Sequence, residues 1–193
     1  IHMTKLKRLT KEYSHKILKT IFQNEKTLLI SLMFVGLIFV FLFLRKIVLP
    51  IVFIPIGVFS MYLYGSTRSM IAFELVTLFA VVTGIAYGGF VGALVGGISC
   101  AIGMIVFTHA DWSYPLWVTA VAIAGYSSSF FSPDQVIFAG VLLAFLVDAF
   151  FYALYLLLAH NPVKLTIWIT SHTFLNYIAF LLLAKPLLTI MKA

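Results

Sequence analysis

Few ionisable side chains lie inside the apolar stretches that fill the chain from Thr27 to Lys192, and the chief ones are Glu74, Asp148 and His172. An ionisable side chain in hydrocarbon costs roughly 3 kcal/mol or more, so such residues usually face a polar pathway or a pocket. At such a place a carboxylate or an imidazole can pass a proton or bind a cationic or hydroxyl-bearing solute. We therefore expect function to reside at these three positions.

Two of these residues have a polar neighbour one helical turn away. Asp148 lies about midway along an apolar stretch, and Tyr152 follows four residues later, which puts both on one helix face. His172 and Asn176 have the same spacing in the last apolar stretch. A polar face in lipid must meet protein or water. These residues are predicted either to line a substrate or proton site, or to hydrogen-bond to a neighbouring helix.

Glu74 and one loop allow two interpretations each. Glu74 is either an interfacial carboxylate paired with Arg68 or a pocket residue that binds a cationic or hydroxyl-bearing ligand. The loop from His109 to Pro115 contains aromatic residues that either anchor the chain among the headgroups or cap a ligand pocket. On the pocket interpretation, the candidate ligand-binding residues are Glu74, Asp148, Tyr152, His172, Asn176, Trp112 and Tyr114.

Several kinds of chemistry have no matching motif in the chain. There is no glycine-rich phosphate loop, no His-Glu-x-x-His helix for zinc, no Gly-x-Ser-x-Gly turn and no aspartate cluster for magnesium. Cys100 is the only cysteine and is interpreted as a packing residue among small neighbours. We therefore expect no cofactor, no metal and no catalytic residue, and we expect a binding function in place of an enzymatic one.

The composition is that of an integral membrane protein. Hydrophobic residues make up 63% of the chain and charged residues only 10%, against roughly 25% charged residues in soluble domains. Residues 1–26 are different, because they alternate apolar and basic side chains and predict an amphipathic helix that lies on anionic headgroups and does not bind nucleic acid. Residues 1–3 are interpreted as a cloning remnant before a natural start at Met3.

Residues 27–193 predict an all-α, polytopic membrane helix bundle of six or seven transmembrane helices, located in the cell membrane. Spans of about 20 apolar residues are needed to cross the hydrocarbon core. Small residues in the fourth stretch, and the pair Gly88 and Gly89 before it, predict a tight hairpin and closely packed helices. The predicted spans are 27–44, 47–64, 71–88, 90–108, 115–131, 134–160 and 164–184.

One part of the chain resembles a known family. The stretch Phe73 to Leu78, which begins Phe-Glu, and the glycine-rich stretch Gly84 to Gly97 are similar to the substrate-binding S components of energy-coupling factor vitamin transporters. The resemblance covers roughly residues 47–190. It implies a six-helix bundle with an extracellular ligand pocket, capped by the loop from His109 to Pro115. It also implies partners, namely a membrane coupling subunit and two ATPases that supply the energy for transport of a vitamin-like solute.

Two other functions remain open on the sequence. The small-residue faces and the basic tail also fit a non-catalytic membrane scaffold or assembly protein, and the glycine-rich hairpin is similar in outline to a family of cell-shape scaffolds. The element His172-x-x-x-Asn176 resembles that of the CAAX-processing membrane proteases, in which glutamates and histidines activate a water for peptide hydrolysis. Asp148 and His172 separate these functions, because only a solute-binding protein needs them to line a pocket.

Overall fold

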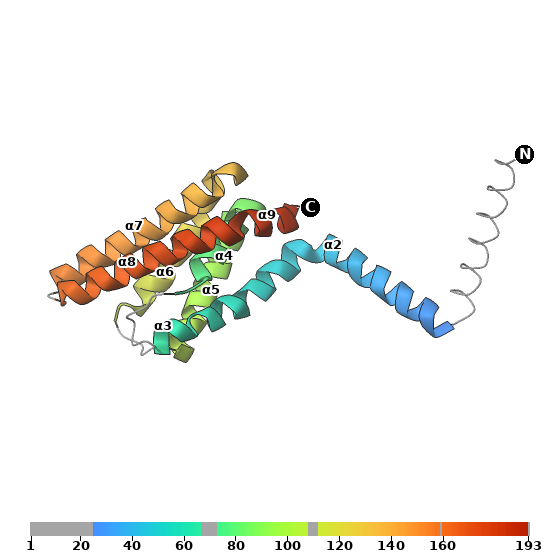
Figure 1. Cartoon of the computed structure of the whole chain (residues 1–193), viewed down its shortest axis with the longest axis horizontal. Helices are drawn as coiled ribbons and strands as arrows, with labels where there is room; N and C mark the ends of the chain where they lie inside the picture. The colour runs from blue at the N-terminus through green and yellow to red at the C-terminus, as the bar shows by residue number, and fades with distance from the viewer. Residues whose placement is uncertain (1–24, 67–72, 108–111, 159, 193) are drawn as a thin grey trace, which may run out of the picture. The chain divides into compact units, whose positions relative to one another are not determined.

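The computed structural model of the chain describes residues 25–66, 73–107, 112–158 and 160–192. All regular elements in those ranges are helices (Figure 1), which confirms the predicted all-α bundle. In chain order they are α2 (Glu25–Ser60), α3 (Tyr62–Ser66), α4 (Val76–Tyr87), α5 (Gly89–Phe107), α6 (Tyr114–Ser127), the 3-10 turns η1 (Ser128–Phe130) and η2 (Pro133–Gln135), α7 (Val136–Leu157), α8 (Pro162–Ala179), the π-helical turn η3 (Phe180–Ala184) and α9 (Lys185–Lys192).

Four helical stretches in the described ranges are long and apolar enough to cross a membrane, so the chain is a membrane protein. They are Leu44–Ser66, Gly89–Phe107, Pro133–Leu157 and Pro162–Lys192. Two further apolar helices, Lys26–Val40 and Val76–Tyr87, are shorter. The amphipathic helix predicted for residues 1–26 lies outside the described residues except at its last two positions.

The break predicted between the first two spans is absent, because α2 continues without interruption through Arg45 and Lys46. Arginine and lysine are good helix formers, so a charged pair alone does not end a helix. Pro50 and Pro55 also lie within α2. The chain divides into two compact units after Arg45, and the apolar side chains described in the first unit, from Leu29 to Val40, are exposed.

Helix α4 is the centre of the second unit, residues 46–193. Every residue from Val76 to Gly84 is buried, and α4 contacts α5, α6, α7, α8 and α9. Its 12 residues extend about 18 Å, against a hydrocarbon core of about 30 Å. The span predicted from residue 71 is therefore corrected: α4 begins at Val76, residues 71–72 lie outside the described ranges, and Glu74 precedes the helix.

Glycines bring α4, α5 and α6 into backbone contact, in agreement with the close packing predicted from their small residues. A Cβ atom added at Gly92 would lie 2.5 Å from the Gly125 carbonyl oxygen, 2.6 Å from the Ala80 carbonyl oxygen and 2.7 Å from the Gly84 Cα atom. The predicted hairpin between α4 and α5 is also present. Gly88 forms it with a φ of 101°, a conformation that side-chain-bearing residues rarely adopt.

Helices α7 and α8 lie side by side and run in opposite directions (Figure 1). Gly140 on α7 leaves room for the ring of Phe180, the first residue of η3, which is fully buried. This contact lies near the start of α7 and the end of α8. It sets the register in which the middle of α7, with Asp148, meets the middle of α8, with His172.

Candidate functional site

His172 lies between the two carboxylates that the sequence singled out. Its Nδ1 atom is 2.7 Å from Oδ1 of Asp148, and its Nε2 atom is 3.2 Å from Oε1 of Glu74. The three residues come from α8, from α7 and from the segment before α4, and all three are buried or nearly so. One imidazole therefore connects three segments of the bundle, and we call these three residues the charged cluster.

Polar contacts hold the two carboxylates in place. The Thr173 hydroxyl donates to Oδ2 of Asp148 at 2.8 Å, and the backbone N–H of Thr77 donates to Oε2 of Glu74 at 2.9 Å. The second contact uses one of the free N–H groups at the start of α4, where the helix dipole favours a negative charge. Ser60 on α2 fixes the same segment, because its Oγ accepts from the backbone N–H of Leu75 at 2.8 Å.

The contact between His172 and Asp148 is an ion-pair contact. Nδ1 of His172 and Oδ1 of Asp148 are 2.7 Å apart, and neither atom has any other hydrogen-bond partner among the described residues. Its strength therefore depends on the charges of both groups. With the imidazole protonated and both carboxylates ionised, the charged cluster has one excess negative charge.

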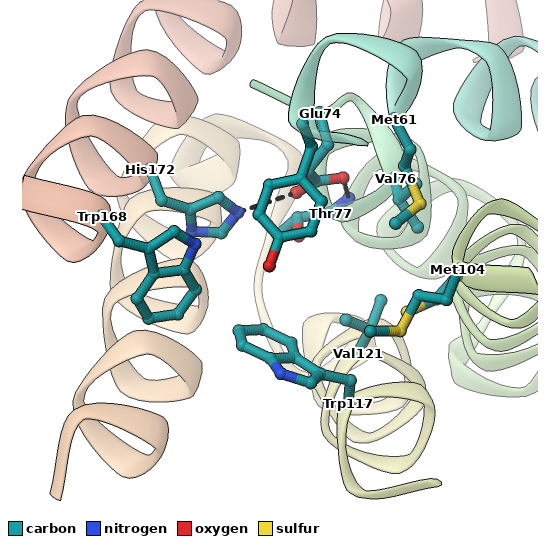
Figure 2. Close-up of a pocket in the computed structure, with 11 residues that line it drawn as sticks. Met61, Glu74, Val76, Thr77, Met104, Trp117, Val121, Trp168 and His172 are labelled. Carbon is teal, nitrogen blue, oxygen red and sulfur yellow. Dashed lines mark hydrogen bonds and ion pairs between the residues drawn. The ribbon is translucent and has the colours of Figure 1, made fainter. Parts of the chain in front are cut away.

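A pocket opens beside the charged cluster (Figure 2). His172 and Trp168 lie on one side, Met61 and Met104 on the other, and Trp117 closes the end opposite Glu74 and Thr77. The remaining lining residues are Tyr64, Val76, Cys100 and Val121, and the cavity volume is about 40 Å³. Asp148 does not line the pocket, because it lies behind His172.

Aromatic contacts fix the two tryptophans of the pocket. Trp117 stacks on Phe151, with ring centroids 3.7 Å apart, and meets Trp168 edge-on at 5.3 Å and 86°. The Trp168 ring lies parallel to the His172 imidazole, 13° apart with centroids at 5.9 Å. Both tryptophans are buried. The pocket wall is therefore preorganised by the packing of α6, α7 and α8.

Comparison of the chain with protein-family models, with curated proteins and with solved structures found no match in any of the three. The geometry of the site therefore has to indicate what the chain does. No set of three His, Cys, Asp or Glu side chains in the described ranges is arranged to hold a metal ion. What the pocket offers is a negatively charged group, a rigid aromatic wall and several sulfur and hydroxyl atoms.

Three of the seven residues proposed from the sequence meet in the charged cluster, namely Glu74, Asp148 and His172. Asn176 is buried one turn further along α8, and its amide donates to the carbonyl oxygen of His172 at 3.1 Å. Its Oδ1 atom has no partner among the described residues. Asn176 therefore contacts the backbone of the charged cluster and does not line the pocket.

The other three proposed residues lie outside the pocket lining. Tyr152 contacts Thr166 through its hydroxyl at 3.3 Å. Trp112 is 52% exposed and meets Tyr155 edge-on, and the Tyr114 hydroxyl donates to the carbonyl oxygen of Ala101. The loop from His109 to Pro115, proposed as a cap, lies partly outside the described residues. Arg68, the alternative partner of Glu74, lies outside them altogether.

The sequence reasoning missed both tryptophans of the pocket. The sequence contained a pattern that marks Trp168. Trp168, His172 and Asn176 follow one another at intervals of four residues, which places all three on one face of α8. Trp117 has no such neighbour on α6. Only the packing of α6 against α7 brings it to the site, so no spacing in the sequence marked it.

Proposed function

We propose that this chain is a multi-pass protein of the cell membrane that binds a small solute in the pocket beside Glu74 and His172. The observation that carries the proposal is the convergence of three ionisable side chains from three separate segments beside a cavity in an apolar bundle. Buried charges in a membrane protein are costly and mark substrate or proton pathways. A cavity with a few convergent polar groups and an aromatic wall is the usual form of a small-molecule site.

Transport is the role that fits such a site in a membrane. We propose, from the resemblance to S components, that the chain delivers its solute with the help of a membrane coupling subunit and two ATPases. The chain itself has no phosphate-binding loop, so a partner has to supply nucleotide-driven work. The basic residues before position 27 would keep the N-terminal tail on anionic headgroups.

The scaffold alternative receives less support from the packing. A scaffold was expected to bind its partner through the small-residue faces. Within the chain, however, Gly92 and Gly96 on α5 already contact α4 and α6, and Gly103 contacts Met61, the residue between α2 and α3. The protease alternative needs a general base that can reach a water. Each ring nitrogen of His172 faces a carboxylate, which leaves no ring nitrogen for that task, and Glu74 has no adjacent glutamate with which to form the paired site of those proteases.

Purification with mass spectrometry tests the proposed function. The full chain is purified from its native membrane in mild detergent, and the retained small molecules and proteins are identified. We expect a small solute in the wild-type protein and its loss in Glu74→Gln, together with a coupling subunit and ATPases. Asp134→Asn is the matched control, because Asp134 is an exposed carboxylate in η2, away from the pocket. Retention of envelope proteins alone, with no solute in any variant, would contradict the proposal.

A further inference from the structure

On the basis of the proposed solute-binding function, we infer that the pocket recognises an organic cation, namely a compact ammonium group with an oxygen acceptor beside it. The sequence left a cationic and a hydroxyl-bearing ligand open at Glu74, and the resemblance does not indicate this solute class. It follows from the charge at the pocket, from the orientation of its aromatic rings and from one unpaired donor.

The charge at the pocket favours a cation. Glu74 and His172 line the cavity, Asp148 lies directly behind His172, and no lysine or arginine lines it within the described part of the chain. With the imidazole protonated, the two carboxylates leave one negative charge uncompensated in a site surrounded by apolar side chains. A bound ammonium group beside Glu74 would balance that charge, whereas a bound anion would double it.

The aromatic wall favours the same solute class. Tryptophan is the best aromatic partner for a cation, within about 6 Å of its ring centroid. Phe151 covers one face of Trp117, which leaves a single face for a ligand. Because Trp117 and Trp168 are perpendicular, with centroids 5.3 Å apart, one ring can offer its face while the other offers its edge.

Trp168 supplies an unpaired donor. Its side chain lines the pocket and is 7% exposed, and its Nε1 atom has no hydrogen-bond partner among the described residues. Figure 2 shows this nitrogen on the edge of the ring nearest His172. A buried indole N–H without an acceptor is costly, so a ligand oxygen at that edge would remove the cost. The ligand therefore needs an acceptor next to its ammonium group.

The size of the cavity limits the recognised group. A volume of about 40 Å³ accommodates about three to four water-sized groups, at 10–15 Å³ each. An aminoethanol group, with an ammonium and a hydroxyl two carbons apart, is of this size and carries both features. Any larger part of the solute would have to extend out of the pocket.

Ethanolamine and three close analogues, namely 1,2-ethanediol, ethylamine and glycolate, test the inference. The full chain is reconstituted in lipid nanodiscs as Trp112→Phe, so that the two pocket tryptophans report binding by fluorescence without the exposed one. Each probe is titrated into the millimolar range at neutral pH. We expect ethanolamine to bind at least about tenfold more tightly than 1,2-ethanediol, which lacks the charge, and more tightly than ethylamine, which lacks the acceptor. Equal binding of ethanolamine and 1,2-ethanediol, or preference for glycolate, would overturn it.

The variants separate this inference from the proposed function. Glu74→Gln should reduce ethanolamine binding about tenfold, because it removes a charged hydrogen bond, and Asp134→Asn should leave it unchanged. If the purified wild-type protein retains a neutral or anionic solute and binds neither ethanolamine nor ethylamine, the proposed function stands and the cation inference is wrong. If it retains no solute and binds no amine, both are wrong. The probe series on the unaltered pocket remains decisive even if Glu74→Gln fails to fold.

Discussion

Asp148→Asn is the substitution with the best-defined consequence for stability. Asp148 is fully buried, with one oxygen 2.7 Å from His172 and the other bonded to Thr173. In the charged form of the pair, two unit charges at this distance attract by about 6 kcal/mol at an effective dielectric constant near 20. Desolvation offsets much of that attraction, and removing one partner of a buried ion pair typically costs 3–5 kcal/mol. His172 would keep its second carboxylate, Glu74, at 3.2 Å, which reduces this cost.

We expect Asp148→Asn to lower the free energy of unfolding by about 3 kcal/mol, near the lower end of that range, because the amide keeps the size of the carboxylate and can still bond to Thr173. Thermal or denaturant unfolding in a fixed detergent measures the change, with the exposed Asp134→Asn as the control. A double-mutant cycle with His172→Gln should show a coupling of at least about 1 kcal/mol. An Asp148→Asn protein as stable as the control, with no coupling, would refute the ion-pair reasoning.

Three further outcomes follow from the packing and the pocket. Gly92→Ala should lower stability by about 1–3 kcal/mol in unfolding experiments, because its methyl group meets backbone of two helices, whereas Gly97→Ala, with its nearest contact at 3.5 Å, should be tolerated. Gly88→Ala should cost about 1–3 kcal/mol in the same assay, because of the φ of 101°. Trp168→Phe should weaken ethanolamine binding in fluorescence titrations more than it weakens ethylamine binding, because only ethanolamine loses a hydrogen bond, while Trp112→Phe should change neither.

Much of the fold was predictable because apolar stretches and small residues act locally. The helical class, the hairpin at Gly88 and the close contact of α4 with α5 each followed from residues near one another in the chain. Two of the predicted boundaries were wrong. Helix α2 continues because Arg45 and Lys46 are good helix formers and do not end it. Helix α4 starts late because Glu74 accepts from the backbone N–H of Thr77, a local contact, and Ser60 accepts from that of Leu75, a tertiary contact that no local pattern shows.

The candidate site was predictable only in part for a similar reason. Burial of a charge in lipid is a strong signal, so the sequence marked Glu74, Asp148 and His172, which the structure brings together. Aromatic residues carry a weaker signal, because tryptophan and tyrosine occur both at membrane interfaces and in packed cores. The sequence therefore favoured the loop residue Trp112, whereas the structure places Trp117 and Trp168 at the pocket.

The three members of the charged cluster differ in how far they reach towards the pocket. The side-chain exposure rises from 0% for Asp148 to 6% for His172 and 12% for Glu74, and only the last two line the cavity. Asp148 on α7 and His172 on α8 already balance one another's charge where the two helices meet. The packing of these helices therefore does not require a third charged residue. Glu74 is the surplus charge, and it faces the cavity. Substitutions should therefore divide by position, because loss of Asp148 removes mainly stability, whereas loss of Glu74 removes mainly binding.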